Sequence, residues 1–505
     1  MPKHKYSYGP ELREYAESIA DKWKLRDKTL FRVEVKNMTW DDDEKEWVVK
    51  MVKTGLCQEN SDVSVRSHFV FAASGLLNCP QLPGIPGIED FQGHSFHTSR
   101  WDYAYTGGSA TDPSLTNLKD KRVGIIGTGA TAIQVVPHLA KWAKELYVFQ
   151  RTPSSVDERA NRPTDAEWWA REIQGQKGWQ RKRNENFHAF LCNFSPRPPI
   201  NMVADKWTEM PSFSALIGGP AKVTMDSIPA HVASMHTLDF PRQERIRSRV
   251  ENIVKDKTTA EKLKPWYPGW CKRPCFHDDY LPSFNLPNVT LVDTNGKGVD
   301  SITENAVVVG DSRYEVDLLV FSTGFRSPSI GISPAFRAGM SVIGRDGESL
   351  DQKFAKAALT LHGVISHGFP NFFWPGPSQA GAGANQMFVV DQFARHVAYI
   401  LSKSAQRVAQ EQQLGQKFTI EPTAEAEEEW SMQILSRAAH FAALAGCTPG
   451  YLNREGEMDR ISGMEERMKA AKGAIWGEGI LDYVNVLEGW RAQGNLRGLE
   501  VTVKG

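Results

Sequence analysis

The chain has 505 residues, 41% of them hydrophobic and 24% charged, which are the proportions of a folded enzyme of two or three domains rather than of a disordered chain. Sixty lysine and arginine residues balance 60 aspartate and glutamate residues, so the formal net charge is zero. This balance argues against a nucleic-acid partner and against a polybasic membrane-surface protein, because both hold phosphate groups through an excess of positive charge.

The N-terminal part of the chain predicts one helix followed by short strands. Apolar residues recur at helical spacing over residues 9–24. Strand patterns follow at residues 29–35, 46–52 and 68–73. The acidic run 41–44 separates the first two strands, and we interpret it as the solvated tip of a hairpin rather than as a metal site. The stretch 80–87 is dense in Pro and Gly and predicts a linker.

A strand, a glycine turn, a helix and a second strand come next, with the three elements predicted at residues 121–126, 131–141 and 146–150. The turn has the pattern G-x-G-x-x-A, in which Gly127 permits a tight turn, Gly129 lets the backbone approach a pyrophosphate and Ala132 lets the helix pack closely on the strand. The N-terminus of the helix presents N–H groups to phosphates. The candidate cofactor-binding residues here are Gly127, Thr128, Gly129, Ala130, Thr131, Ala132, Ile133 and Gln134.

The end of the second strand indicates which nucleotide binds. It closes with Gln150-Arg151-Thr152 and has no acidic residue where the ribose 2′-hydroxyl of NAD(H) would be bound. An arginine there suits a 2′-phosphate, so Arg151 and Thr152 predict NADP(H). The alternative, a structural turn followed by a surface arginine, remains open.

The later part of the chain alternates between helical and strand patterns. Residues 166–264 are helical in pattern and rich in Trp, Arg and Glu, which predicts an insertion rather than another strand–helix unit. Strands are predicted at residues 289–293, 306–309 and 317–322. From residue 386 onward the chain is mostly helical and closes with a helix at 480–493.

The cysteines and the hydropathy of the chain indicate in which cellular compartment it functions. Six cysteines are too few for a disulfide scaffold at this length, and Cys271 and Cys275 lack the companions of a zinc site, so no metal is expected. The N-terminus lacks the apolar region of a signal peptide, and no apolar run approaches the roughly 20 residues that a membrane helix needs. We therefore expect a cytoplasmic protein with reduced cysteines and no membrane span.

Upstream of the glycine turn the chain carries the pattern F-x-G-x-x-x-H-x-x-x-W-D, formed by Phe91, Gly93, His97, Trp101 and Asp102. This pattern resembles the fingerprint of the type I Baeyer–Villiger monooxygenases, which are class B flavoprotein monooxygenases. Residues 72–75 and 317–325 resemble the family's two linker strands, and residues 369–377 resemble the segment that leads to the flavin ring. Residues 267–274, 447–453 and 490–491 resemble further segments of fungal members that tailor polyketides, including the sterigmatocystin and aflatoxin enzymes.

The resemblance implies an α/β fold with two dinucleotide-binding, Rossmann-like domains and a helical insertion in the NADP domain. It implies that NADPH reduces FAD, that O₂ adds to the flavin as a peroxide, and that the peroxide converts a ketone into an ester or lactone. Arg273 would be the catalytic arginine, and Lys272 and Arg151 would hold the NADP phosphate. Val35, Thr323 and Gly324 would lie at the flavin, and His97 and Trp101 would couple the domains.

The motif order predicts five segments. These are the remaining FAD domain and linker at 1–115, the two parts of the NADP domain at 116–155 and 265–315, the helical insertion at 156–264, and the FAD-domain return with the C-terminal helices at 316–505. The substrate would be a polyketide-derived ketone together with O₂, while the oligomeric state stays open.

The sequence departs from the family before residue 115, where no two glycines form an FAD-binding G-x-G-x-x-G turn. We therefore expect an N-terminally incomplete FAD domain, either because the natural protein is longer or because the chain is a degenerate paralogue. An unpaired sheet edge, exposed apolar surface and poor retention of FAD are expected to follow. Three alternatives remain open: oxygenation of N or S, an NADP reductase without oxygenation, and a non-catalytic NADP-binding remnant.

Overall fold

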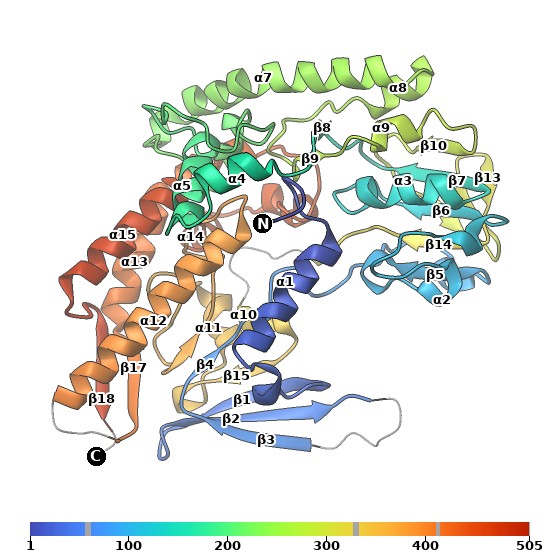
Figure 1. Ribbon diagram of the computed structural model, residues 1–505. Coiled ribbons are helices and arrows are strands. Elements are labelled where there is room, and N and C mark those ends of the chain that lie inside the picture. The colour runs from blue at the N-terminus through green and yellow to red at the C-terminus, as the bar shows by residue number, and fades with distance from the viewer. Residues whose placement is uncertain (56–61, 327–332, 411–414, 504–505) are drawn as a thin grey trace.

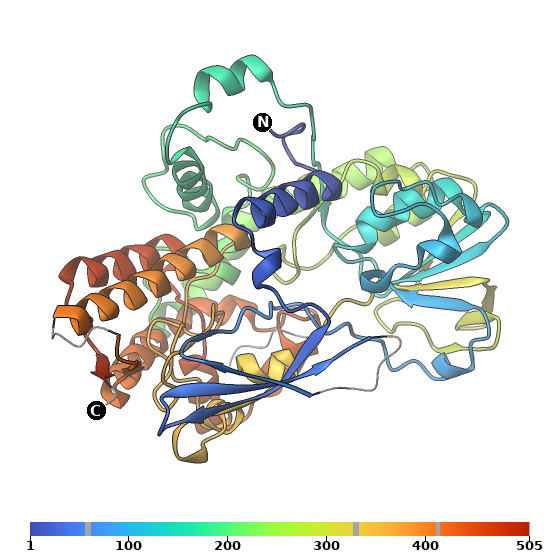
Figure 2. The ribbon, with the colours of Figure 1, turned by 60° about the horizontal axis from the view of Figure 1, so that its bottom comes forward.

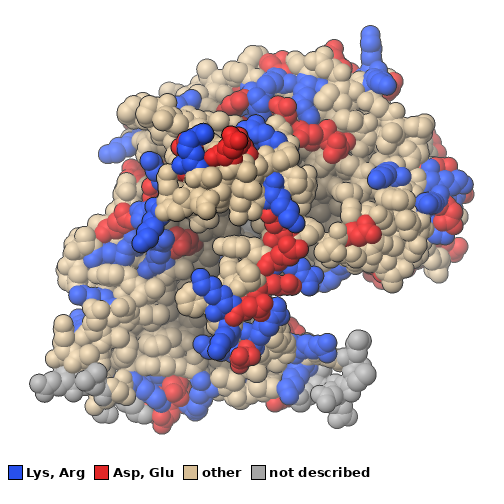
Figure 3. All heavy atoms as spheres, viewed as in Figure 1, with Lys and Arg blue, Asp and Glu red and all other residues tan. Residues whose placement is uncertain are grey.

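Two sheets of different kinds lie in the two lobes of Figure 1, the parallel sheet at the right and the four-stranded sheet at the bottom, and helices join them. The computed structural model describes residues 1–55, 62–326, 333–410 and 415–503. On the described surface that faces the viewer in Figure 3, lysines and arginines are interspersed with aspartates and glutamates, as the balanced composition suggests.

The first lobe is built on a parallel sheet with the strand order β10-β7-β6-β14-β5. Its strands are β5 (His94–His97), β6 (Arg122–Ile126), β7 (Glu145–Gln150), β10 (Val289–Asp293) and β14 (Leu318–Phe321). Helix α3 (Ala132–Trp142) buries Ile133, Val136 and Leu139 with residues of the sheet in one hydrophobic core. Val307 and Tyr314 pack with Phe149 and Leu319 in another core, so the antiparallel strands β11 (Ser301–Ile302), β12 (Ala306–Val309) and β13 (Ser312–Glu315) cover the sheet as well. This layered parallel sheet confirms the predicted α/β fold.

The second lobe contains a four-stranded sheet with the order β15-β1-β2-β3. Its strands are β1 (Val33–Asp41), β2 (Glu46–Lys53), β3 (Asp62–Ser67) and β15 (Ser341–Ile343). The acidic run 41–44 lies at the tip of the β1–β2 hairpin, as predicted. The predicted first strand was placed too early, because Leu30 and Phe31 are exposed and the pairing begins at Val33 and extends to Asp41. Trp40 and Trp47, facing each other across the hairpin, anchor this sheet on helices α10 (Pro334–Ala338) and α11 (Leu350–Lys356).

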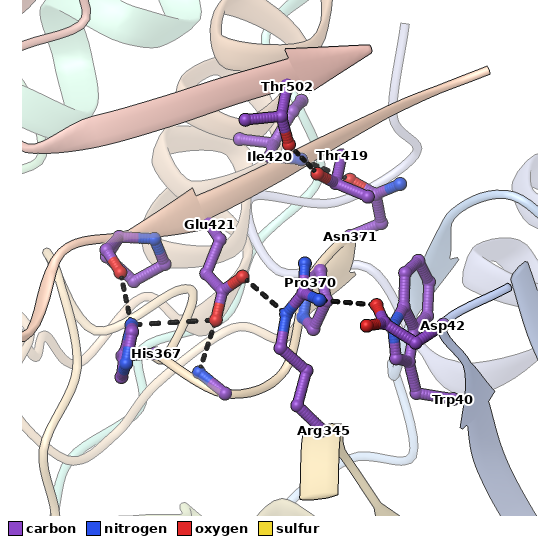
Figure 4. Close-up of polar contacts among 12 residues, drawn as sticks. Trp40, Asp42, Arg345, His367, Pro370, Asn371, Thr419, Ile420, Glu421 and Thr502 are labelled. Carbon is purple, nitrogen blue, oxygen red and sulfur yellow. Dashed lines mark hydrogen bonds and ion pairs between the residues drawn. The ribbon is translucent and has the colours of Figure 1, made fainter. Parts of the chain in front are cut away.

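Polar contacts tie the hairpin tip to the C-terminal strands (Figure 4). Arg345 pairs with Asp42 at the tip and, through Nε, with Glu421 Oε2 at 2.9 Å. Asn371 Oδ1 accepts a hydrogen bond from the N–H of Ile420 at 2.7 Å. Glu421 and Ile420 belong to β17 (Phe418–Pro422), which pairs with β18 (Leu499–Val503). Arg345 therefore clamps two sheets that are remote in sequence.

Helices make up the insertion and the C-terminal portion. The insertion contains α4 (Ala166–Glu172), α5 (Trp179–Leu191), α6 (Ser214–Ile217), the long α7 (Ile228–Ile253) and α8 (Lys257–Leu263). The C-terminal portion contains α12 (Gln386–Gln410), α13 (Ala424–Arg437), α14 (Met464–Lys472) and α15 (Gly479–Gln493). Buried residues of α5, α12, α13 and α15 share one core, so the insertion packs against the C-terminal helices.

Helix α1 (Gly9–Lys22) forms where predicted, but none of its residues is buried. Leu12 is 56% exposed and Tyr15 is 63% exposed, and Figure 2 shows the helix on the outside of the molecule. The strand expected at residues 68–73 is reduced to β4 (Val70–Phe71), which pairs with β16 (Phe372–Phe373), and Phe71 is 41% exposed.

The cysteines include one pair that the sequence did not predict. Cys271 and Cys447 form a disulfide with a Cα–Cα distance of 5.2 Å, so the expectation of fully reduced cysteines is wrong for this pair. The two residues lie 176 positions apart, and no spacing rule could connect them. In the described ranges no group of His, Cys, Asp and Glu side chains has the arrangement of a metal site. None of the described helices is long and apolar enough to cross a membrane.

Candidate nucleotide and active site

The glycine turn lies where three neighbouring strands, β7, β6 and β14, end side by side. The Gly127 N–H donates to the carbonyl of Phe149 at 3.0 Å, and the Gly127 backbone has a φ of +106°. A Cβ at Gly127 would lie 2.4 Å from the carbonyl oxygen of Ser322. Both the conformation and the close approach therefore require glycine at this position.

The second half of the turn leaves a space beside the helix. A Cβ at Gly129 would meet no atom within 4 Å, whereas Ala132 and Ile133 are buried and seat α3 on the sheet. Thr131 precedes the first helical residue, and the Ala130 carbonyl accepts from Gln134 Nε2 at 2.7 Å. This open backbone at a helix N-terminus fits a pyrophosphate.

Thr128 and the segment that follows β7 border that space. Thr128 is buried and its hydroxyl donates to the Thr152 carbonyl at 2.8 Å, while Ser154 donates to the Thr128 carbonyl. The glycine turn is thereby fixed to the segment that carries Arg151.

A short parallel pair brings the predicted cations together. Strand β8 (Val156–Asp157) follows Arg151, and strand β9 (Cys275–Phe276) follows Lys272 and Arg273; the two strands pair directly. Lys272 Nζ donates to the Pro449 carbonyl at 2.8 Å, and Arg151 Nη2 reaches the same oxygen at 3.5 Å. Burial, reinforced by the charge of Arg151, lowers the pKa of Lys272 to about 8. Two cations around one oxygen fit a 2′-phosphate.

The catalytic candidate Arg273 is exposed and lies next to Tyr451. Burial raises the pKa of the Tyr451 hydroxyl, and the charge of Arg273 opposes that rise. The Arg273 carbonyl accepts a hydrogen bond from the Cys275 thiol. The side chain of Arg273 therefore projects from the same loop as Lys272, with its backbone fixed at the start of β9.

Helix α7 positions that loop, and sequence reasoning missed these residues. Asp239 is buried; its Oδ2 accepts from the Gly269 N–H at 2.7 Å and its Oδ1 from the Ser212 hydroxyl at 2.8 Å. Arg242, one turn further along, is also buried and lies 3.6 Å from the carboxylate of Asp157 in β8. The spacing of two polar residues on one helix face was the available signal, but an exposed polar face has the same pattern.

The chain around the start of the predicted linker 80–87 runs alongside the second linker, the segment that follows β14. Thr323 Oγ1 donates to the Gln81 carbonyl at 2.5 Å, and the Gln81 N–H donates to the Gly324 carbonyl at 3.0 Å. The Arg326 N–H continues the pairing to the Cys79 carbonyl at 2.9 Å. The predicted linker 80–87 is therefore partly hydrogen-bonded to the segment that directly follows β14.

The fingerprint residues pack around β5 at the edge of the nucleotide sheet. A Cβ at Gly93 would lie 2.5 Å from the Phe91 ring, so this glycine lets the ring fold back. Asp102 caps the short helix α2 (Tyr103–Thr106) and lies 3.0 Å from His94 Nε2. The Trp101 indole donates to Thr106 Oγ1 at 3.0 Å.

His97 is the fingerprint residue that reaches the linker. It is buried, which lowers its pKa, and its ring lies 5.6 Å from the ring of Phe325 in the second linker. His97 thus contacts the connection between the lobes, whereas the structure gives it no contact with Arg273 among the described interactions.

Fewer residues of the structure point to a binding site for the flavin. Val35 lies at an irregularity of β1 and packs against the core of the second lobe. The described residues include both linkers, but none of them forms a second glycine-rich phosphate turn. No flavin contact is therefore assigned from this structure, while the glycine turn 127–134, Arg151 and Lys272 are the candidates for a nucleotide site.

Comparisons with known proteins show which proteins this chain is similar to. A family model described as flavin-binding monooxygenase-like matches residues 4–166. The chermesin D/asnovolin J monooxidase nvfH of Aspergillus novofumigatus is 49% identical over 508 residues, covering 99% of this chain and 76% of that protein. The FAD-binding monooxygenase ausC of Emericella nidulans is 48% identical over 509 residues, covering 99% of this chain and 73% of that protein.

The fold is similar to that of a solved structure. The polycyclic ketone monooxygenase from the thermophilic fungus Thermothelomyces thermophila superposes with a TM-score of 0.95 at 48% identity, covering 100% of this chain and 79% of that chain. The chain thus spans about three quarters of the length of each of these proteins.

Proposed function

The chain belongs to the fungal FAD-binding monooxygenases of the Baeyer–Villiger type, and from this membership we propose that it inserts one oxygen atom of O₂ next to a ketone carbonyl in a polycyclic, polyketide-derived metabolite. NADPH is the electron donor and FAD the cofactor of this reaction. The product is an ester or a lactone.

The observation that carries the proposal is the β8–β9 pairing. It brings the segment after Arg151 beside the segment after Lys272 and Arg273, so that Arg151 and Lys272 both reach the Pro449 carbonyl oxygen and Arg273 is the next residue along the chain. The nucleotide and the catalytic arginine would then share one loop, so that binding of NADPH and placement of Arg273 depend on the same backbone.

Each residue has a distinct task in this proposal. The glycine turn binds the pyrophosphate, and Arg151 and Lys272 bind the 2′-phosphate. FAD, when bound, passes electrons from NADPH to O₂. Arginine carries a planar cationic guanidinium, so Arg273 would stabilise the negative charge that develops on the oxygen of the attacked ketone.

The same proposal includes a division of the chain into domains. Residues 116–155 and 265–315 form the NADP domain together with strands β5 (His94–His97) and β14 (Leu318–Phe321) of the same sheet. Residues 156–264 are its helical insertion, and the remainder of 1–115 and 316–505 is the flavin side. Asp239 of the insertion holds the loop that precedes Arg273 at Gly269, and Arg242 pairs with Asp157 of β8, the partner strand of β9, which gives the insertion a role in catalysis as well as in packing. A cytoplasmic location, where NADPH is supplied, completes the proposal.

The test uses the purified protein with FAD, NADPH, a panel of polycyclic ketones and ¹⁸O₂. Mass spectrometry is expected to show a product heavier than the ketone by one ¹⁸O atom, and NMR to place that atom in an ester. The Arg273→Ala variant is expected to consume NADPH without forming ester. Arg171→Ala, which removes an exposed arginine paired with Glu172 on α4, is the matched control and keeps ester formation. A hydroxylated product, or ester formed by Arg273→Ala, would refute the proposal.

A further inference from the structure

Residues 447–456, called the strap below, lie across the two cations of the nucleotide site. The strap begins at Cys447, which is bonded to Cys271, the residue before Lys272. The Pro449 carbonyl accepts from Lys272 and Arg151, and Glu455 Oε2 lies 3.3 Å from Arg151 Nη2. The strap therefore meets the cations with one carbonyl and one carboxylate.

The strap is an ordered loop with its own internal bonding. Asn453 is 5% exposed and its Oδ1 accepts from the N–H groups of Gly450 and Gly456 at 2.9 and 3.1 Å. Its Nδ2 donates to the Cys447 carbonyl at 2.9 Å. One buried amide thus holds both ends of the strap together, which presents Pro449 and Glu455 to the cations as a preformed unit.

The strap neutralises the charges of Arg151 and Lys272 only in part, so these two residues can still bind an anion. Within the part of the chain that the structure describes, Glu455 is the one carboxylate paired with Arg151, and Lys272 is bound to a carbonyl rather than to a carboxylate. Arg151 and Glu455 are about half exposed, at 50% and 45%, so solvent screens their attraction. A phosphate dianion offers more charge and more acceptor oxygens than this single carboxylate.

We propose that the strap is an internal stand-in for the 2′-phosphate of NADP(H), and that Glu455 must leave Arg151 before the nucleotide phosphate binds. This inference rests on the proposed function, which assigns Arg151 and Lys272 to that phosphate. Glu455 then sets how strongly the protein prefers 2′-phosphorylated nucleotides, because it competes with the 2′-phosphate alone. The Cys271–Cys447 bond keeps the competitor close, since a tethered group acts at a high effective concentration.

Isothermal titration with adenosine 2′,5′-bisphosphate tests the proposal, using the oxidised protein at low ionic strength. Glu455→Gln is expected to bind this probe about three- to fivefold more tightly, the size of an exposed ion pair. The gain is expected to shrink at high salt, where exposed charges are screened. Adenosine 5′-monophosphate, which lacks the 2′-phosphate, is expected to bind both forms equally. Glu457→Gln, an exposed glutamate two positions further on, is the matched control.

The tether has its own arm of the test. Cys447→Ser, or reduction of the wild type, is expected to tighten binding of the bisphosphate at least twofold, because the strap then spends less time on the cations. Weaker binding after loss of the disulfide would show that the strap forms part of the phosphate site, and would overturn the proposal. Unchanged or weaker binding by Glu455→Gln would overturn it as well.

Arg151→Ala separates this inference from the function on which it rests. If Arg151→Ala binds the bisphosphate as tightly as the wild type does, the phosphate assignment itself is wrong. If Arg151→Ala binds at least tenfold more weakly while Glu455→Gln is unchanged, the phosphate assignment stands and the strap is not a competitor.

Discussion

Two alanine substitutions in the glycine turn should have opposite consequences. In Gly127→Ala the added Cβ would sit 2.4 Å from the Ser322 carbonyl oxygen at a φ of +106°. The left-handed conformation costs about 1–2 kcal/mol for a residue with a Cβ, and forcing β6 away from β14 costs about 1–3 kcal/mol more. The free energy of unfolding should therefore fall by about 2–5 kcal/mol, a large share of the total for a folded domain.

Gly129→Ala is the matched control, because its Cβ meets no atom within 4 Å. Stability should change by less than about 0.5 kcal/mol, as for other open sites. The same Cβ would project where the pyrophosphate approaches, so the affinity for NADP⁺ should fall at least tenfold. Urea unfolding followed by circular dichroism measures the first effect and isothermal titration the second. A stable Gly127→Ala protein, or a Gly129→Ala protein that binds NADP⁺ normally, would refute the reasoning.

Three further predictions follow from charges and burial. The affinity for adenosine 2′,5′-bisphosphate should fall as the pH rises above about 8, where Lys272 loses its proton in the free protein; Lys272→Met should abolish that dependence in titrations between pH 7 and 9. Burial lowers the pKa of His362 to about 3 and that of its hydrogen-bonded neighbour His396 well below its usual value, so both are neutral when folded. Since the unfolded chain takes up these protons below about pH 6.5, stability should fall by about 1.4 kcal/mol per pH unit for each histidine as the pH drops, and His396→Gln should flatten that slope in urea unfolding. Asp239→Ala should raise the fraction of NADPH consumed without ester formation, measured as hydrogen peroxide released, while Asp239→Asn, which can still accept from the Gly269 N–H, should restore most of the coupling.

Local pattern predicted the elements of the strand–helix–strand unit around the glycine turn. The predicted strand 121–126, helix 131–141 and strand 146–150 correspond to β6, α3 and β7 within one residue at each end, because their apolar periods match one buried face or a fully buried strand. The same reasoning failed at β1, where the apolar residues Leu30 and Phe31 are exposed and pairing with β2 decides where the strand begins. Strand boundaries depend on a partner strand, and the chain's local composition does not contain that partner.

The site shows the same limit more sharply. The glycine turn after β6 and the position of Arg151 after β7 could be predicted, because a tight turn between a strand and a helix needs specific residues at fixed spacing. Cys447, Pro449 and Glu455 reach the same place from the C-terminal portion, and two of the three contacts use a disulfide and a backbone carbonyl. A carbonyl carries no signature in a sequence, and a pair of cysteines 176 residues apart has no spacing rule. Contacts of this kind become visible only once the chain is folded.

The end of β14 lies next to both the glycine turn and the backbone that joins the two lobes. The Ser322 N–H donates to the Ile126 carbonyl at 2.9 Å, and its own carbonyl lies against Gly127. The next residue, Thr323, donates to Gln81 in the other linker at 2.5 Å. One residue therefore separates the backbone that lines the nucleotide turn from the backbone that joins the lobes, and His97 packs on the same stretch through Phe325. Because a side chain at position 127 would meet the Ser322 carbonyl, glycine is what lets the turn lie directly against the backbone that continues into the linker.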